Sequence, residues 1–147
     1  MKKNIAKLSV LAIITIALTA CWNVPAPEVV FNEADLLGLW AEDNGTNNDT
    51  LPVHFVRFTT EQDETGEYKY GREWNEDEEI FEEDLQPYGN GWFKYKLDIP
   101  NQLTEIHLMD NGGAYVPKTY KITKLTASQL QYKDDKGNTT YFHKAGK

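Results

Sequence analysis

The chain has 147 residues, with 15 lysine and arginine side chains against 23 aspartate and glutamate side chains, and its formal net charge is −8 at pH 7. A surface with this charge repels nucleic acid and anionic lipid headgroups, so we expect no nucleic-acid partner. The chain has one cysteine, Cys21, which excludes an intrachain disulfide.

Residues 1–21 have the pattern of a secretory signal peptide. Met1 is followed by Lys2 and Lys3, and residues 5–18 form a mostly apolar run. This run is shorter than the ~20 residues that a membrane-spanning helix needs, so it favours an export signal; the alternative is a span that ends in a chance cysteine. Thr19 and Ala20 before Cys21 resemble the lipobox of bacterial lipoproteins.

That resemblance implies cleavage before Cys21, followed by attachment of lipid to its thiol and to the new amino terminus. It divides the chain into a lipoprotein signal peptide (1–20), a lipidated cysteine with a tether (21–34) and one folded domain (35–147). An acylated Cys21 leaves no thiolate for a nucleophile or a zinc site. The expected location is the bacterial cell envelope, on a membrane through the lipid. Asn23, where a retention signal would have aspartate, favours the periplasmic face of the outer membrane.

The folded part reads as short strands separated by turns. Alternating or β-branched and aromatic runs predict eight strands, at 37–42, 53–59, 67–74, 93–99, 103–109, 115–125, 129–133 and 139–144. One short helical turn is expected just before the first strand. Regular strand-turn-strand spacing predicts an all-β fold, an antiparallel up-and-down barrel of about eight strands, with a sandwich as the alternative. Closure into a barrel would leave no exposed sheet edge.

The segment Leu36-Leu37-Gly38-Leu39-Trp40 resembles the start of the lipocalin and calycin families. The resemblance implies that Gly38 permits a close approach at the barrel floor and that Trp40 plugs that end. The chain lacks the Thr-Asp-Tyr segment of classical lipocalins, and its arginines, Arg57 and Arg72, come too early to cover the tryptophan as a late arginine does there. It is therefore more similar to the small bacterial lipocalin-like lipoproteins. The fold alone implies no particular task.

Residues 67–74 alternate in character and suggest a ligand site. Tyr68, Tyr70, Arg72 and Trp74 share one face, and Glu67, Lys69 and Glu73 share the other. Because the second face suits water, we expect the first to point inward and, with Tyr95, to line a pocket for a ligand. Arg72 would there bind a ligand carboxylate or pair with a local acid.

The interior of a barrel of this size is either filled by side chains or holds one small ligand, and both alternatives stay open. The expected inward residues are Trp40, Phe55, Tyr68, Tyr70, Trp74, Phe93, Tyr95, Leu97, Ile106, Leu108, Tyr120, Ile122, Leu130, Tyr132 and Phe142.

Motifs for metal binding or catalysis are missing from the sequence. His54, His107 and His143 lie on three strands without zinc-ligand spacing, and the acidic runs 43–49 and 73–84 lack the spacing of a calcium loop. No nucleophile elbow surrounds Ser128, the one serine after Cys21. We therefore expect no cofactor, no metal and no enzyme. The expected function is the binding of a small apolar or amphipathic ligand. The alternative is a protein-interaction or protease-inhibitor-like module that acts through rim loops 43–50 and 73–84.

Overall fold

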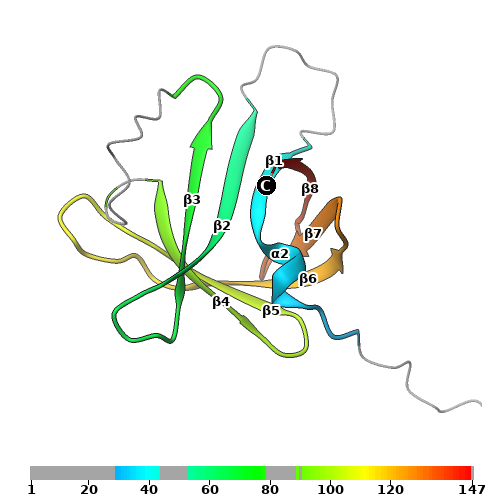
Figure 1. Cartoon of the computed structure of the whole chain (residues 1–147), viewed down its shortest axis with the longest axis horizontal. Helices are drawn as coiled ribbons and strands as arrows, with labels where there is room; N and C mark the ends of the chain where they lie inside the picture. The colour runs from blue at the N-terminus through cyan, green and yellow to red at the C-terminus, as the bar shows by residue number, and fades with distance from the viewer. Residues whose placement is uncertain (1–28, 44–52, 79–88, 90, 147) are drawn as a thin grey trace, which may run out of the picture.

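Eight antiparallel strands close into one barrel (Figure 1), as the sequence predicts. The computed structural model describes residues 29–43, 53–78, 89 and 91–146. Each strand pairs with the next along the chain, and the last pairs with the first. The elements are α2 (Glu33–Leu36), β1 (Gly38–Glu42), β2 (His54–Gln62), β3 (Lys69–Asn75), β4 (Trp92–Asp98), β5 (Gln102–His107), β6 (Lys118–Leu125), β7 (Gln129–Lys133) and β8 (Thr139–Gly146).

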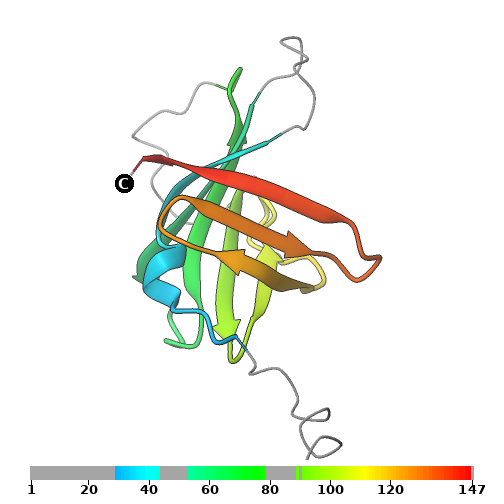
Figure 2. The same cartoon turned by 90° about the vertical axis from the view of Figure 1, so that its right-hand side faces the viewer.

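The short helix α2 lies beside the start of β1, at one end of the barrel (Figures 1 and 2). Asn32 caps it by accepting a hydrogen bond from the Ala34 amide, at 3.0 Å. Leu36, its last residue, is fully buried, and the Leu36 carbonyl accepts a 2.7 Å hydrogen bond from the indole nitrogen of Trp40. The helix therefore both covers this end of the core and satisfies the one polar atom of the buried tryptophan.

Lys144 of β8 covers the Trp40 ring, with its ammonium 4.1 Å from the ring centroid. The same ammonium donates a hydrogen bond to the Leu37 carbonyl. Gly38 makes the close approach of β8 to β1 possible, because it has a φ of 110° and a Cβ there would lie 3.1 Å from Lys144 Cε. A lysine of the last strand thus lies where the resemblance would have placed a late arginine.

The buried core fills the barrel from the α2 end upward. It comprises Leu36, Trp40, Val56, Phe58, Phe93, Tyr95, Leu103, Ile122, Leu125, Leu130, Tyr132 and Phe142, with Phe31, Leu97 and Tyr120 packed against it. Phe58 meets both Phe93 and Tyr95 edge to face. Of the residues expected to point inward, Phe55 and Ile106 lie on the outer face, and Leu108 lies beyond the end of β5.

The face of strand β3 that points into the barrel is the opposite of the predicted face. Gly71 lies opposite Phe93, and Lys69 lies opposite Tyr95. Phe93 and Tyr95 both belong to the buried core. A Cβ on Gly71 would lie 2.2 Å from Phe93 Cζ, so the glycine makes room for this ring. Because side chains alternate along a strand, the prediction that Tyr70, Arg72 and Trp74 point inward is wrong. The residues on the outer face are Tyr70, Arg72 and Trp74, and Tyr68 precedes them with Lys96 over its ring.

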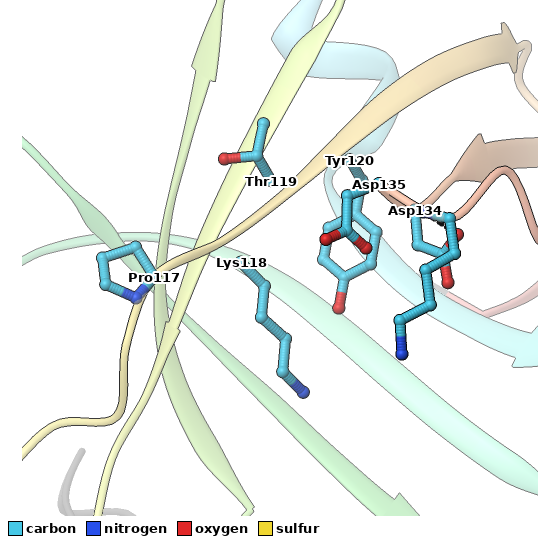
Figure 3. A pocket seen from close by; sticks show the side chains of 7 residues that line it. Pro117, Lys118, Thr119, Tyr120, Asp134 and Asp135 are labelled. Atoms are coloured by element: carbon cyan, nitrogen blue, oxygen red, sulfur yellow. Dashed lines mark hydrogen bonds between the residues drawn. The ribbon is translucent and has the colours of Figure 1, made fainter.

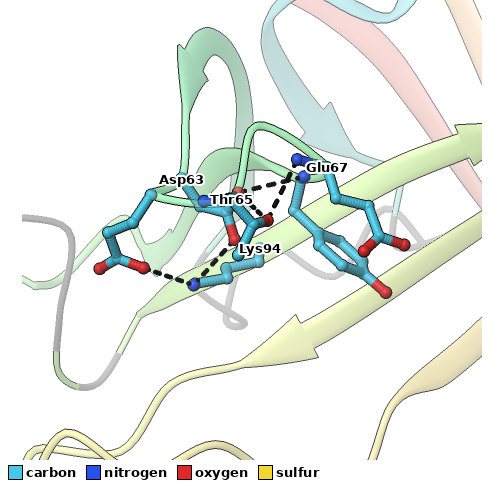
Figure 4. A network of polar contacts seen from close by, with 6 residues as sticks. Asp63, Thr65, Glu67 and Lys94 are labelled. Carbon is cyan, nitrogen blue, oxygen red and sulfur yellow. Dashed lines mark hydrogen bonds and ion pairs between the residues drawn. The ribbon is translucent and has the colours of Figure 1, made fainter.

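A buried carboxylate organises the turn between β2 and β3 (Figure 4). Asp63 Oδ1 accepts hydrogen bonds from the Thr65 amide and hydroxyl and from the Tyr68 amide, while Asp63 Oδ2 lies 3.0 Å from Lys94 Nζ. Burial alone would raise the pKa of Asp63, but these hydrogen bonds outweigh it and lower the pKa to about 2. The turn is thereby fixed to β4 across the outer face of the barrel.

Candidate functional site

The end of the barrel away from α2, here called the mouth, carries a row of alternating carboxylates and imidazoles. His54 Nδ1 lies 2.9 Å from Glu42 Oε2, and His54 Nε2 lies 3.4 Å from Glu73 Oε2. The other oxygen of Glu73 lies 3.1 Å from His107 Nδ1, and His107 Nε2 lies 3.5 Å from Glu105 Oε2. Five inward side chains from β1, β2, β3 and β5 thus form one continuous polar chain.

The pairing fixes the charge of both histidines. A neutral imidazole donates from one nitrogen only, whereas His54 and His107 each have a carboxylate at both ring nitrogens. Hydrogen bonds to Glu42 and then to Glu73 raise the pKa of His54 to about 9. Hydrogen bonds to Glu105 and then to Glu73 raise the pKa of His107 to about 9 as well. Both rings are therefore imidazolium at neutral pH.

Glu73 is the centre of this polar chain. Burial alone would raise its pKa, but the hydrogen bonds from His107 and His54 outweigh burial and lower the pKa to about 2. Glu73 points into the barrel. Its negative charge is tolerated there because the imidazolium rings of His54 and His107 compensate it. The mouth therefore gains its polar character without an unpaired charge at its centre.

Glu105 is the exceptional member of the polar chain. It is 4 % exposed, and its Oε1 has no hydrogen-bond partner in the described part of the chain. Burial raises the pKa of this carboxyl, although the hydrogen bond with His107 opposes the effect. A buried acceptor without a donor costs free energy, so such atoms are uncommon in structural networks and more typical of functional sites.

A cavity of about 610 Å³ lies between the start of β6 and the turn from β7 to β8 (Figure 3). Lys118 and Tyr120 line it from β6, and Asp134 and Asp135 line it from the turn. Lys118 is the cross-strand partner of Glu105, so the cavity borders the polar chain. It exceeds the roughly 300 Å³ at which ligand pockets begin.

Tyr120 gives the cavity an aromatic wall. Its ring lies 4.7 Å from that of Tyr132, centroid to centroid, and Tyr132 in turn lies 5.3 Å from Phe142. Burial is the main cause that raises the pKa of Tyr120, so its phenol stays a neutral hydrogen-bond donor and acceptor. The lining thus combines an apolar surface with groups of both charges.

The residues predicted to bind a ligand do not come together at the mouth. Tyr95 points inward as expected, but it is fully buried in the apolar core and donates a 2.6 Å hydrogen bond to the Thr59 carbonyl. Tyr68, Tyr70, Arg72 and Trp74 are on the outer face, as described above. Cys21 lies outside the described residues, as do most of the rim loops 43–50 and 73–84.

Sequence reasoning missed all five members of the polar chain as a group. One signal was available: His54 shares a strand face with Val56 and Phe58, which are core residues. In the sequence, the histidines are candidates only for zinc ligands, and they lack the spacing that such a site needs. His143 lies apart from the mouth chain, 2.5 Å from Asp43.

No cluster of three or more histidine, cysteine, aspartate or glutamate residues in the described ranges is arranged to hold a metal ion. Within the same ranges, no helix has the length and apolar character to cross a bilayer. No family model, no curated protein and no solved structure matches the chain. Its architecture, a closed antiparallel barrel of eight strands, is compatible with a lipocalin-like fold.

Proposed function

We propose that this chain is a lipid-anchored, lipocalin-like protein of the bacterial cell envelope that binds a small amphipathic ligand at the barrel mouth without catalysis. The observation that carries the proposal is the 610 Å³ cavity lined by Lys118, the cross-strand neighbour of Glu105, whose buried Oε1 has no hydrogen-bond partner among the described residues. The opposite end of the barrel is filled by Trp40 and Leu36, which leaves the mouth as the place for a ligand.

The lining suggests the chemistry of the ligand. An unpartnered carboxylate oxygen requires an N–H or O–H donor, and Tyr120 with Tyr132 offers an apolar surface beside it. Glu105 Oε1 is shielded from solvent, so a ligand in the cavity reaches it only after the surrounding side chains rearrange. A molecule with a donor group and a short apolar part fits this lining better than a fatty acid.

The charge state of the mouth supports binding rather than catalysis. A general acid or base works best when its pKa is near the working pH. The pKa values of His54 and His107 are about 9 and that of Glu73 is about 2, so these groups exchange no proton readily at pH 7. The polar chain is better suited to hold the strands of the mouth in place.

Titration of tryptophan fluorescence with octylamine, octanol and octanoate tests the proposal. We expect octylamine or octanol to bind below about 100 μM, which corresponds to about 5.5 kcal/mol, and octanoate to bind more weakly. Tyr120→Leu should weaken binding at least tenfold, whereas Tyr141→Leu, a half-exposed tyrosine on β8, should leave it unchanged. Failure of all three probes to bind in this range refutes the ligand-binding proposal.

The alternative, an interaction module acting through the rim, is favoured by two exposed apolar residues. Tyr115 and Val116 lie in the segment between β5 and β6, at the mouth, with 52 % and 83 % of their surface exposed. If no small probe binds, cross-linking in intact cells from position 115 tests this function. A specific protein adduct that is lost with Val116→Asp supports it.

The anchor is proposed from the residues around Cys21 and has its own test. The protein from cells should start at Cys21 and carry both a thioether-linked diacylglyceryl group and an amide-linked acyl chain, which together give stable attachment. Mass spectrometry reads this directly, and Cys21→Ala should move the protein out of the membrane fraction. Slow digestion of the protein by protease added to intact cells is expected for the periplasmic face, whereas rapid digestion indicates surface exposure.

A further inference from the structure

The two arginines of the chain lie side by side on the outer face of the barrel. Arg57 of β2 and Arg72 of β3 are cross-strand partners in the sheet register. Opposed residues in an antiparallel pair have Cβ atoms about 5 Å apart, so like charges at these positions repel each other. Arg57 is exposed and Arg72 is half-buried, so both can reach solvent.

Each guanidinium is held against a tryptophan ring. Arg72 Cζ lies 5.2 Å from the centroid of Trp92, and Arg57 Cζ lies 5.6 Å from that of Trp74. Phe55 stacks on Trp74 at 5.7 Å and supports it. Stacking engages the face of a guanidinium and leaves the N–H groups at its edge available for hydrogen bonds.

Neither guanidinium forms a hydrogen bond or an ion pair with any residue that the structure describes, although the chain has a large excess of acids. The lysines on the same face behave differently. Lys94 Nζ lies 3.0 Å from Asp63, and Lys96 Nζ lies 3.0 Å from Glu67. Among the described residues, Lys94 and Lys96 therefore have acid partners, whereas the two stacked arginines have none.

We propose that Arg57 and Arg72 form a binding site for a phosphate group, as free phosphate or as a small phosphate ester. A guanidinium binds oxyanions through two parallel hydrogen bonds, and an anion placed between two of them relieves their repulsion. A carboxylate has two oxygens and satisfies one guanidinium in this way, whereas a phosphate has enough oxygens for both. Trp74 and Trp92 keep the two planes oriented before the anion arrives.

Nuclear magnetic resonance of the purified full chain is well suited to test this site, because only two arginine Nε–H signals exist and each single variant identifies one of them. At constant ionic strength, inorganic phosphate or glycerol 3-phosphate should shift both signals and the indole N–H signals of Trp74 and Trp92. The stronger of the two ligands identifies the source, free anion or ester. Acetate should bind at least tenfold more weakly than the better of them.

Variants show whether binding depends on the paired hydrogen bonds of a guanidinium or only on its positive charge. Arg57→Gln and Arg72→Gln should each weaken phosphate binding at least tenfold, and Arg57→Lys should weaken it similarly because the charge remains but the paired hydrogen bonds are lost. Lys121 and Lys133 are also opposed across two strands and are exposed, so Lys121→Gln with Lys133→Gln is the matched control and should have no effect. Equal binding of acetate, full binding by Arg57→Lys, or an equal loss in the control overturns the proposal.

Discussion

The ammonium of Lys144 lies 4.1 Å from the centre of the Trp40 indole and so joins the last strand of the barrel to the first. Lys144 also donates to the carbonyl of Leu37, at the junction of α2 and β1. One side chain thus connects three parts of the chain that meet at the filled end of the barrel.

Replacing Lys144 should test the worth of this contact. Lys144→Met keeps the length of the side chain but removes its positive charge and its hydrogen-bond donor. We expect a loss of about 1–2 kcal/mol in the free energy of unfolding. Lys144→Arg keeps both interactions and should stay within about 0.5 kcal/mol of the parent. Urea unfolding measures both variants. Equal stability of Lys144→Met and the parent would show that the contact is incidental.

Trp40 should be among the most costly positions to truncate. It is fully buried and hydrogen-bonded to Leu36, so Trp40→Ala should cost about 3–5 kcal/mol of unfolding free energy. Trp40→Phe retains much of the packing and should cost less. Thermal unfolding decides the matter, since a melting temperature within one or two degrees of the parent for Trp40→Ala would contradict the role of Trp40 in the core.

Asp63 and Glu64 offer a matched pair of acids around one lysine. Lys94 Nζ lies 3.0 Å from buried Asp63 and 3.6 Å from Glu64, whose side chain is 85 % exposed. Asp63→Asn loses the charged hydrogen bond and should cost about 2–3 kcal/mol, whereas Glu64→Gln should change stability by less than about 0.5 kcal/mol. Chemical unfolding at pH 7 compares the two. Similar losses in both variants would mean that burial does not decide the strength of these pairs.

The polar chain at the mouth should give stability a defined pH dependence. The pKa values of His54 and His107 rise from 6.5 to about 9 on folding, so their contribution is complete below pH 6.5 and is lost as pH rises through 9. The pKa of Glu73 falls from 4.5 to about 2, so its contribution is present above pH 4.5 and is lost as pH falls through 2. Urea unfolding from pH 3 to 10 should therefore show declining stability on both sides of a maximum near pH 5–6.

Variants assign the alkaline decline to its source. His54→Gln should reduce the loss of unfolding free energy between pH 6.5 and 9 relative to the parent. His143→Gln, which removes an exposed histidine from the outer face, should leave that decline unchanged. An unaltered decline in His54→Gln would mean that the mouth histidines are not protonated as their contacts indicate.

The strands were accessible to sequence reasoning because turns and alternation are local properties. The strand predicted at 129–133 is β7 itself, whereas the one predicted at 115–125 begins only at Lys118, after Pro117. The inward face of β3 was not accessible, because it depends on partners from other strands. Glu73 looks like a solvent-facing acid until His54 and His107 are placed beside it, and Gly71 looks unremarkable until Phe93 occupies its space.

The pairing of β1 with β8 is the step that closes the barrel during folding. Asp43 and His143 meet across this pair of strands although they are 100 positions apart in the chain. Such non-local closure is slow compared with the formation of hairpins, since the whole intervening chain must be ordered first. Until then β1 and β8 are both open strand edges that can pair with another molecule. Refolding yield should therefore fall with protein concentration even when the closed barrel, once formed, is stable.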